Sequence, residues 1–354
     1  MDKRKIGING IAGRVGKFTA YELFRGGAII GAVNDLASTD EIVGALSHRD
    51  GVHGDLDWVV EKIDEVHIGI GNQVIEVYHE KDPATILWGD EIIAVDECTG
   101  FFTERTAAER HFAGGSCLET ILISAPGKGD MKTLVMGVNH TAYNPNDARD
   151  NVISNASCTT KAMAVPIQVL YDLGANLHYV DMVTVHAATN TQKPLDFMST
   201  YGVLDTIQTA SSGASVALTK LFPELDGKVR CFAMRVPTRD GSFVKMEIQA
   251  ESDNLEAEYL NNRFREAVND PRYCGRLSVF EGMEIASHDL IGNVASSVIT
   301  LSKTRSTEVH RGHPRYPENM ISDVSLVIGY DNERGPSKDL AMLTQYVMQP
   351  NQGG

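Results

Sequence analysis

The sequence predicts an α/β fold in two domains, the first with a parallel sheet and the second α+β with a mostly antiparallel sheet. A chain of 354 residues is long for one hydrophobic core. In its first part, short apolar strand-like runs alternate with helical patterns, which is typical of a parallel sheet. In its later part, longer strand-like runs follow one another with few helices between them. We expect residues 1–156 and 331–354 to form the first domain and 157–330 the second.

Composition excludes several classes of protein. The chain is 42% hydrophobic and 22% charged, a balance typical of globular proteins. A net charge of −15 disfavours nucleic-acid and membrane partners, because both require a basic face. No apolar run approaches the roughly 18 residues that span a bilayer. Five cysteines without CxxC spacing make no disulfide framework, and Met1–Lys5 leads into no secretory apolar segment, so we expect a cytoplasmic protein.

The first elements predict a dinucleotide site. A strand at Ile6–Ile8 is followed by a turn with Gly10, Gly13 and Gly16, a helix at Lys17–Phe24 and a strand at Ala28–Asn34 that Asp35 closes. Glycines let the backbone approach a pyrophosphate at the helix N-terminus. The Asp35 carboxylate would accept a hydrogen bond from a ribose 2′-OH and would repel a 2′-phosphate, which favours NAD over NADP. The spacing is GxxGxxG, one residue longer than GxGxxG, and glycines also serve ordinary turns.

The alternation of strands and helices continues. We expect strands at Val74–His79, Ile92–Val95 and Thr120–Ser124, and a helix at Thr106–Phe112. The carboxyl ends of such strands face the ligand crevice of an open parallel sheet. Thr99 and Ser124 at these ends are therefore candidate cofactor contacts, although either position also suits a plain turn.

A nucleophile is predicted near the middle of the chain. Thr133–Asn139 resembles a strand and Ala162–Leu173 a helix, so Cys158 lies in a hydroxyl-rich turn that opens a helix. Unpaired N–H groups at a helix start are expected to lower the thiol pKa. His186, at the end of the strand-like run Tyr179–His186, offers a base. The alternative is an inert core cysteine.

The later part supplies candidate binding residues between its strands. Expected strands are Val229–Val236, Ser242–Ala250, Ser296–Leu301 and Asp323–Tyr330, and expected helices are Ser215–Leu221, Leu255–Val268 and a terminal Lys338–Val347. Arg235, late on a strand, requires an anion, either a phosphate or a structural carboxylate. Thr159, Thr189 and Ser212 lie in hydroxyl-rich turns, and Asn332 can bond a carboxamide. The spacing His310–Arg315 resembles a metal motif, but no other ligand completes it, so we expect a solvated loop and no metal.

Together these stretches resemble the phosphorylating glyceraldehyde-3-phosphate dehydrogenase family, over nearly the whole chain. The resemblance rests on Gly7–Gly10, Asn34–Leu36, Val52–Gly54, Glu97–Gly100, Ser124–Pro126, Val135–His140, Ser154–Thr160, Thr184–His186, Thr191–Lys193, Phe222–Leu225, Arg235–Thr238 and Tyr330–Glu333. It implies an N-terminal Rossmann NAD-binding domain completed by the C-terminal helix, a catalytic domain, a homotetramer and a role in glycolysis.

The resemblance also implies a reaction and its residues. The Cys158 thiolate would attack glyceraldehyde 3-phosphate, with His186 as base, and inorganic phosphate would convert the resulting thioester to 1,3-bisphosphoglycerate. Thr189 and Arg235 would hold the substrate phosphate, and Ser157, Thr159, Ser212 and Gly213 the attacking phosphate. The cofactor contacts carried over are Asn9, Gly10, Gly13, Arg14, Val15, Asp35, Thr99, Ser124 and Asn332.

The chain departs from the family pattern near both predicted sites. Ala12 resembles an insertion in the glycine turn, and Lys161 stands where the family has Asn. The segment from His186 to Ser212 is shorter than in the family and has no Arg after Lys193. We therefore consider that Lys161 partly replaces that arginine as the cation for inorganic phosphate, against the alternative of a solvated helix lysine.

Three alternative functions remain open at this point. Erythrose-4-phosphate dehydrogenases share the constellation of residues, and semialdehyde dehydrogenases use a Cys/His pair with GxxGxxG turns. A catalytically idle NAD-binding regulatory protein is the alternative outside enzymes.

Overall fold

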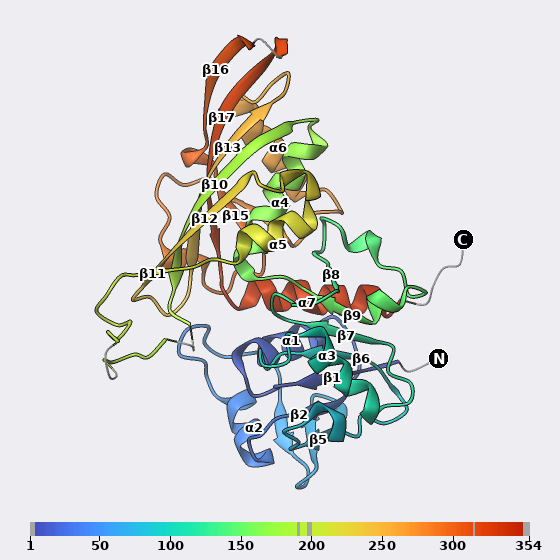
Figure 1. Cartoon of the computed structure of the whole chain (residues 1–354). Helices are drawn as coiled ribbons and strands as arrows, with labels where there is room; N and C mark the ends of the chain where they lie inside the picture. The colour runs from blue at the N-terminus through green and yellow to red at the C-terminus, as the bar shows by residue number, and fades with distance from the viewer. Residues whose placement is uncertain (1–3, 190–191, 197–199, 314–315, 350–354) are drawn as a thin grey trace. The chain divides into compact units, whose positions relative to one another are not determined.

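The computed structural model describes residues 4–189, 192–196, 200–313 and 316–349, with backbone only at 309–313 and 316–320 (Figure 1). Thr191, Pro314 and Arg315 lie outside the described residues. The chain divides into two compact units, Met1–Ala156 with Pro336–Gly354, and Ser157–Gly335. Each unit has its own sheet.

The first unit is built on a nine-stranded sheet of order β3-β4-β5-β2-β1-β6-β7-β9-β8. Pairing is parallel from β5 to β8, and only β3–β4 and β4–β5 are antiparallel. The predicted parallel, Rossmann-type sheet is confirmed. The strands are β1 Lys5–Asn9, β2 Ile30–Asn34, β3 Val60–Lys62, β4 His67–Ile70, β5 Gln73–Tyr78, β6 Ile92–Glu97, β7 Thr120–Ile123, β8 Lys132–Thr133 and β9 Val152–Ser154.

Helices cover this sheet and share its core. The helices are α1 Arg14–Arg25, α2 Thr39–Ser47, α3 Arg105–Ala108 and α7 Arg334–Val347, with short 3₁₀ turns at Pro83–Thr85, Glu109–Gly114, His140–Ala142 and Ala148–Asn151. Ile6 and Ile8 of β1 belong to the same buried cluster as Leu340 and Leu343 of α7. The C-terminal helix therefore completes the core of the N-terminal unit, as the resemblance implied.

The second unit has an eight-stranded sheet of order β11-β12-β10-β13-β17-β15-β14, with β16 paired to β17. Only β10–β12 and β14–β15 are parallel, so the mostly antiparallel α+β prediction is confirmed. The strands are β10 Asn176–Ala187, β11 Gln208–Ala210, β12 Val229–Val236, β13 Ser242–Glu251, β14 Leu277–Phe280, β15 Ser297–Thr300, β16 Arg305–His313 and β17 Tyr316–Tyr330.

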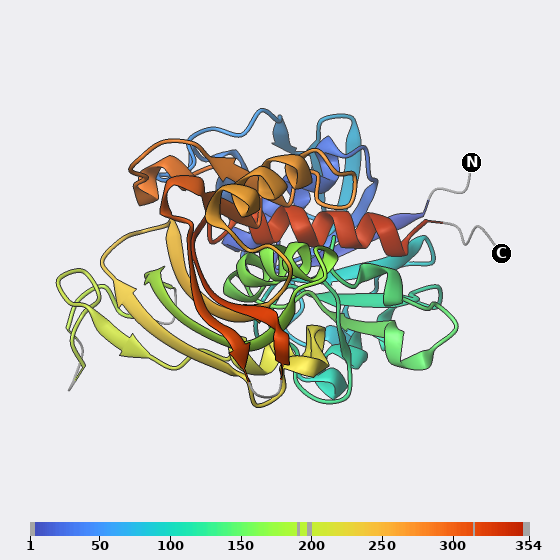
Figure 2. The ribbon, with the colours of Figure 1, turned by 90° about the horizontal axis from the view of Figure 1, so that it is seen from above.

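Three helices, α4 Cys158–Asp172, α5 Ala214–Leu221 and α6 Ala257–Val268, pack on one face of this second sheet (Figure 2). The alternation along β13 follows from this one-sided cover, because Val244 and Met246 are buried while Lys245 and Glu247 are exposed. Further 3₁₀ turns lie at Pro223–Leu225, Ser287–Leu290 and Leu301–Lys303.

Two sequence-based expectations about elements are wrong. Thr133–Asn139 is a strand only at Thr133, because Asn139 folds the segment into turns: its Oδ1 accepts the Val135 N–H at 2.9 Å and its Nδ2 donates to the Thr133 carbonyl at 2.8 Å. The strand that leads to Cys158 is β9 instead. His310–His313, expected in a solvated loop, belongs to β16, which pairs with β17 in a long hairpin.

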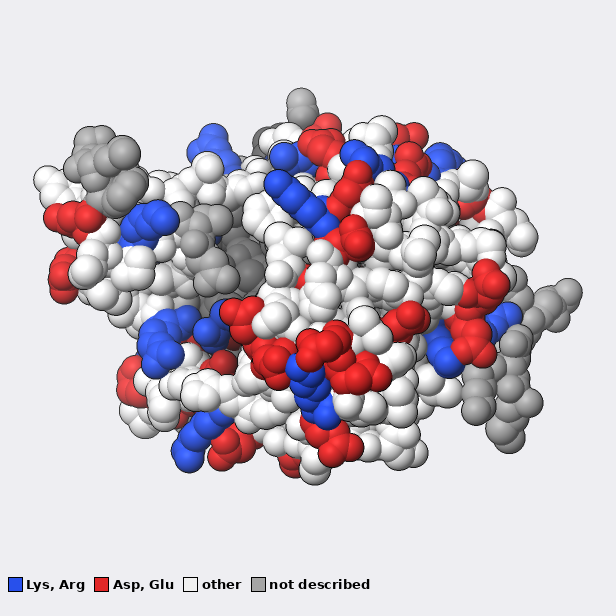
Figure 3. All heavy atoms as spheres, turned by 90° about the horizontal axis from the view of Figure 1, so that it is seen from below, with Lys and Arg blue, Asp and Glu red and all other residues white. Residues whose placement is uncertain are grey.

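The surface carries both signs of charge. On the face shown in Figure 3, acidic and basic side chains are interspersed and no continuous basic area is visible. Among the described residues, no helix is both long enough and apolar enough to cross a bilayer.

Two acids that are adjacent on β6, Asp96 and Glu97, are both completely buried. The Asp96 Oδ1 lies 2.6 Å from the Oγ1 of Thr344 on α7, and that hydroxyl lies 2.9 Å from the Leu340 carbonyl. A hydroxyl has one hydrogen, so both bonds form only if Asp96 is protonated and donates to Thr344. Burial agrees with this, since it raises the pKa of Asp96 to about 8 despite the Thr344 bond.

We expect Asp96→Asn to stabilise the protein at pH 8 and to lose that advantage towards pH 4. Between the ordinary carboxyl pKa near 3.9 and the folded value, only the unfolded state of the wild type is ionised. Wild-type stability therefore falls by about 1.4 kcal/mol per pH unit as pH rises through this window. The variant, whose amide N–H can replace the acid O–H, has no such slope. Urea unfolding of both proteins between pH 5 and 8 measures the difference, and parallel curves would contradict the assignment.

Candidate active site and dinucleotide site

Cys158 is the first residue of α4, as the hydroxyl-rich turn predicted. Ser157 is the N-cap and its Oγ accepts the Thr160 N–H at 3.1 Å. Ala156, just before the cap, has a φ of 58°, the one described non-glycine residue in the left-handed region. The turn is thus sharp and fixed by its own side chains, which gives the sulfur a defined position.

The structure brings His186 to this sulfur. The Cys158 Sγ lies 3.5 Å from the His186 Nε2. His186 is near the end of β10 and pairs in parallel register with Arg235 on β12. The Arg235 Nη1 contacts the His186 Nδ1, which also lies 2.8 Å from the Ala187 carbonyl. The predicted Cys/His pair and the predicted anion-binding arginine therefore form one cluster within the second unit.

Burial sets the charge state of this pair. It raises the pKa of the Cys158 thiol, and the Thr159 hydrogen bonds and the charges of Lys161 and Arg235 oppose it only in part. Burial, followed by the Arg235 charge, lowers the pKa of His186 to about 4. The expectation that the helix start lowers the thiol pKa is therefore wrong for this state, because desolvation outweighs the helix. Thiol and imidazole are both neutral at pH 7, so the imidazole is free to accept a proton.

Two further predicted residues adjoin the cluster. The Asn332 Nδ2 lies 3.2 Å from the His186 Nε2, and its Oδ1 accepts the Ser242 hydroxyl at 2.9 Å. The Thr159 Oγ1 lies 2.9 Å from the hydroxyl of the buried Tyr330, a residue that the sequence did not mark as part of the site.

Thr189, Ser212 and Gly213 occupy turns of the same unit. Thr189 follows β10, and its N–H donates to the Gln192 Oε1 at 3.0 Å. Ser212 and Gly213 precede α5, where the Ser212 Oγ accepts the Ala214 N–H at 3.2 Å. Their assignment to phosphate sites stays a prediction.

The glycine turn of the first unit fits a pyrophosphate. Gly10 has a φ of +84°, and a Cβ on Gly16 would lie 2.1 Å from the Gly10 carbonyl oxygen, so only glycine allows α1 to start so close to the turn. The N-cap of α1, Gly13, provides no side-chain acceptor, and the first turn has no acidic residue. The positive dipole end of this helix is therefore not neutralised by an acidic residue in its first turn, which favours an anion there.

Asp35 directly follows β2, as predicted, and Ala12 is hydrogen-bonded to it. The Ala12 N–H donates to the Asp35 Oδ2 at 2.9 Å, and the Ala37 N–H donates to the Oδ1 at 3.1 Å. Each carboxylate oxygen keeps a second lone pair for a ribose hydroxyl. The insertion therefore anchors the longer turn to the carboxylate instead of disrupting the site.

The other predicted cofactor residues lie near the same edge of the sheet. Asn9 ends β1, Val15 is in the first turn of α1, and Ser124 directly follows β7. The Arg14 Nη2 lies 4.0 Å from Asp50. Burial raises the pKa of Asp50, but the backbone N–H groups of His53 and Val52 and the charges of Arg14 and His53 together outweigh it and lower the pKa to about 2. Thr99 directs both its N–H and its hydroxyl to Glu97, so its side chain faces inward.

Sequence reasoning missed several residues of this region. Glu97 ends β6 and His111 lies in the 3₁₀ turn Glu109–Gly114; both are completely buried, and nothing in the local sequence marks His111 at all. Leu36 and Phe101 are 67% and 85% exposed after β2 and β6, where an apolar surface suits a purine. Exposed apolar residues in the turns that follow two parallel strands of one sheet are a signal that could have been used.

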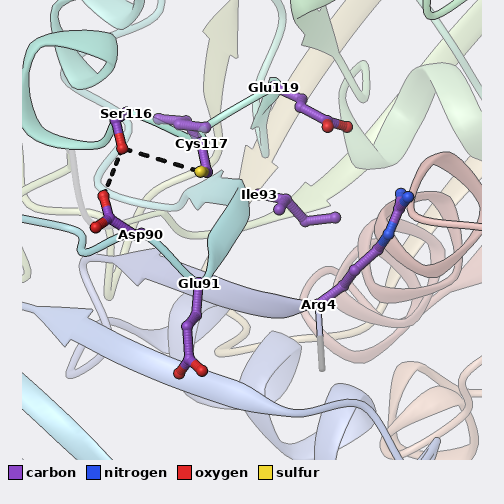
Figure 4. Close-up of a pocket in the computed structure, with 8 residues that line it drawn as sticks. Arg4, Asp90, Glu91, Ile93, Ser116, Cys117 and Glu119 are labelled. Atoms are coloured by element: carbon purple, nitrogen blue, oxygen red, sulfur yellow. Dashed lines mark hydrogen bonds between the residues drawn. The ribbon is translucent and has the colours of Figure 1, made fainter. Parts of the chain in front are cut away.

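A hollow of about 430 Å³ lies at the edge of this sheet opposite to the glycine turn (Figure 4). Its lining comes from the amino ends of β1, β6 and β7, and consists of Arg4, Asp90, Glu91, Ile93, Ser116, Cys117, Leu118 and Glu119. Ligands of open parallel sheets bind at the carboxyl ends. This hollow is therefore not the dinucleotide site.

We expect His186→Asn to slow alkylation of Cys158 by iodoacetamide at pH 7 by about tenfold or more. The thiol is neutral in the free protein, so its reaction depends on a nearby proton acceptor. Peptide mass spectrometry can follow Cys158 separately from the exposed Cys117 and Cys274, whose rates serve as internal controls. An unchanged Cys158 rate would show that the thiolate forms without the imidazole.

Comparison with known proteins identifies the family of the chain. The NAD binding domain model of glyceraldehyde 3-phosphate dehydrogenase matches residues 4–105, and the C-terminal domain model of the same family matches residues 157–313. The chain is 36% identical over 353 residues to a glyceraldehyde-3-phosphate dehydrogenase of Priestia megaterium, covering 97% of this chain and 98% of the relative. Relatives of the same name from Streptomyces coelicolor (36%) and Bacillus subtilis (35%, glyceraldehyde-3-phosphate dehydrogenase 1) have the same coverage. The chain therefore belongs to the glyceraldehyde 3-phosphate dehydrogenase family of oxidoreductases, whose cofactor is NAD.

Proposed function

We propose that this protein oxidises glyceraldehyde 3-phosphate with NAD and inorganic phosphate to give 1,3-bisphosphoglycerate. The observation that carries the proposal is the Cys158 Sγ at 3.5 Å from the His186 Nε2, with Arg235 beside the same imidazole. A nucleophile, a base and an anion-binding cation are what the first step on a phosphorylated aldehyde needs.

In the first step the Cys158 sulfur bonds to the aldehyde carbon while the thiol proton passes to His186. The Ala187 carbonyl can only accept, so the His186 Nδ1 carries a hydrogen when it bonds there. The Nε2 then presents its lone pair to the sulfur. The imidazolium then gives this proton to the former carbonyl oxygen, so the product is a neutral hemithioacetal on Cys158 and His186 is again a free base.

Arg235 links substrate binding to the basicity of His186. Its guanidinium is a donor only, yet it faces the Nδ1 that donates to Ala187. A substrate phosphate that draws the guanidinium away relieves this contact and removes the charge that lowers the pKa of His186. The base is thus strengthened when the substrate is bound.

When bound, NAD would supply the acceptor for the hydride that leaves the hemithioacetal carbon, and loss of that hydride would leave a thioester on Cys158. His186 takes the hydroxyl proton in that step, and inorganic phosphate then attacks the thioester and releases Cys158. We assign Thr189 and Arg235 to the substrate phosphate and Ser157, Thr159, Ser212 and Gly213 to the attacking phosphate. Asn332, held by Ser242, is assigned to the cofactor carboxamide.

We further propose a cytoplasmic homotetramer. The open face of the second sheet exposes Val185 and Phe232, each 40% exposed, which is typical of a surface that a second copy covers. All five cysteines are free thiols, as a reducing compartment would keep them.

The proposed reaction is tested by NADH formation from glyceraldehyde 3-phosphate in the presence and absence of phosphate or arsenate, beside erythrose 4-phosphate. We expect turnover that depends on phosphate or arsenate, a kcat/KM at least tenfold lower for erythrose 4-phosphate, and no turnover by Cys158→Ser. A preference for erythrose 4-phosphate would reassign the substrate. Turnover that does not need phosphate would show that water accepts the acyl group. NAD binding without turnover would support the regulatory alternative.

Lys161 acts on the sulfur in our proposal, not on the attacking phosphate. Its side chain is completely buried, so the interpretation as a solvated helix lysine is wrong. It lies three residues after Cys158, on the same face of α4, and its charge lowers the pKa of the thiol. This effect ranks behind burial and the Thr159 hydrogen bonds, and because Lys161 is buried its charge is weakly screened by salt.

We expect Lys161→Asn to slow Cys158 alkylation at pH 7.5 several-fold and to change the phosphate KM less than twofold. The pH profile of alkylation should shift to higher pH, because the thiolate loses a neighbouring cation. A phosphate KM that rises tenfold with an unshifted profile would return Lys161 to the role of phosphate cation. Thermal unfolding of the variant provides the check on folding.

A further inference from the structure

A chain of buried side-chain hydrogen bonds runs along the carboxyl edge of the first sheet. It crosses the ends of strands that are neighbours in the order β5-β2-β1-β6 (Figure 1). The Asn34 Nδ2 donates to the Asn9 Oδ1 at 2.8 Å, and the Asn9 Nδ2 donates to the Glu97 Oε2 at 2.6 Å. Beyond Glu97, His111 continues the chain to Trp88. All five side chains are at most 3% exposed.

At the β2 end, the backbone fixes the direction of these bonds. The Glu80 N–H donates to the Asn34 Oδ1 at 2.8 Å, and the Asn34 Nδ2 donates to the Glu80 carbonyl at 2.9 Å. A backbone N–H and a carbonyl cannot exchange roles, so the Asn34 amide has one orientation. Its Nδ2 therefore faces Asn9, and the Asn9 Nδ2 must face Glu97.

At the other end, Trp88 fixes the direction in the same way. An indole N–H only donates, and the Trp88 Nε1 lies 3.2 Å from the His111 Nδ1. That nitrogen must accept, so the hydrogen of the neutral His111 is on Nε2, 3.1 Å from the Glu97 Oε2. His111 therefore donates to Glu97.

Every group that faces Glu97 is then a donor. The Thr99 N–H donates to the Oε1 at 2.8 Å, and the Thr99 hydroxyl, which already accepts the Phe101 N–H, donates to the same oxygen. With Asn9 and His111 on the Oε2, four donors saturate the two oxygens. Glu97 is thus an ionised carboxylate on which two directed chains of hydrogen bonds converge.

The residues tied together are predicted NAD contacts or lie next to them. Asn9 and Thr99 are themselves predicted contacts, and Asn34 precedes the predicted contact Asp35. We propose that Glu97 is a positioning residue for NAD, which holds the turns after β1, β2 and β6 in one arrangement through the fixed direction of its hydrogen bonds. It touches no part of the cofactor in this role. The proposal rests on NAD as cofactor, not on the identity of the aldehyde.

Glu97→Gln tests the proposal, because glutamine keeps the shape and adds a donor where only acceptors fit. We expect the Kd for NAD, measured by titration of the apo protein, to rise at least tenfold, and the Kd for ADP-ribose to rise as much. Asp96→Asn is the matched control, since the neighbouring buried acid contacts Thr344 and not the turns. It should leave both Kd values within twofold. A Glu97→Gln protein with native circular dichroism and NAD affinity within twofold of wild type would overturn the proposal.

A compensating substitution separates hydrogen-bond direction from general destabilisation. When Asn9→Asp is combined with Glu97→Gln, the amide introduced at position 97 can donate to the carboxylate introduced at position 9, which still accepts from Asn34. One unfavourable contact remains, between the amide N–H introduced at position 97 and the His111 N–H. We therefore expect the double variant to recover only part of the lost NAD affinity. Asn9→Asp alone places two carboxylates together, so we expect it to bind NAD more weakly than wild type. If Glu97→Gln does not fold, the double variant should restore a folded, NAD-binding protein. Additive losses, or a double variant that does not bind NAD, would overturn the proposal.

Discussion

The candidate active site depends on the register between β10 and β12. Parallel pairing places His186 directly opposite Arg235, and the packing of α4 on the same sheet brings Cys158 to the imidazole. Side chains alternate between the two faces of a strand, so a slip of one residue would send His186 or Arg235 to the other face and separate them. The Ser297 hydroxyl of β15, which donates to the Ala162 carbonyl at 2.8 Å, fixes α4 against this sheet.

The same burial that holds the cluster together decides how its chemistry can start. A thiolate and an imidazolium would both be poorly solvated here, so the free protein keeps the neutral pair. In the reaction proposed above, charge would appear only when a substrate supplies an anion for Arg235 and an electrophile for the sulfur. A nucleophile that is neutral at rest is also less exposed to oxidation, because thiolates are the reactive form of cysteine.

Local sequence patterns were sufficient to predict most helices and strands and the site motifs. They failed where contacts between residues distant in the sequence determine the structure or the charge state. Cys158, His186, Arg235, Asp35 and the glycine turn were all predictable, because strand ends and helix starts mark them. The turn at Thr133–Asn139 was not, since its apolar residues are buried as in a strand while Asn139 closes the backbone on itself. The direction of the shift in the Cys158 pKa and the burial of Lys161 both depend on packing across the second unit, which no local sequence pattern indicates.

Asp96 and Glu97 show why burial alone does not determine charge. They are adjacent on β6, equally buried and on opposite faces of the sheet, yet their partners impose opposite protonation states. Asp96 meets one hydroxyl whose hydrogen is already engaged, so it must carry a proton itself. Glu97 meets four donors, so it must be ionised. The proton is therefore assigned from the direction of each hydrogen bond. That direction is fixed where the network ends at a backbone group or an indole, because these groups cannot exchange the roles of donor and acceptor.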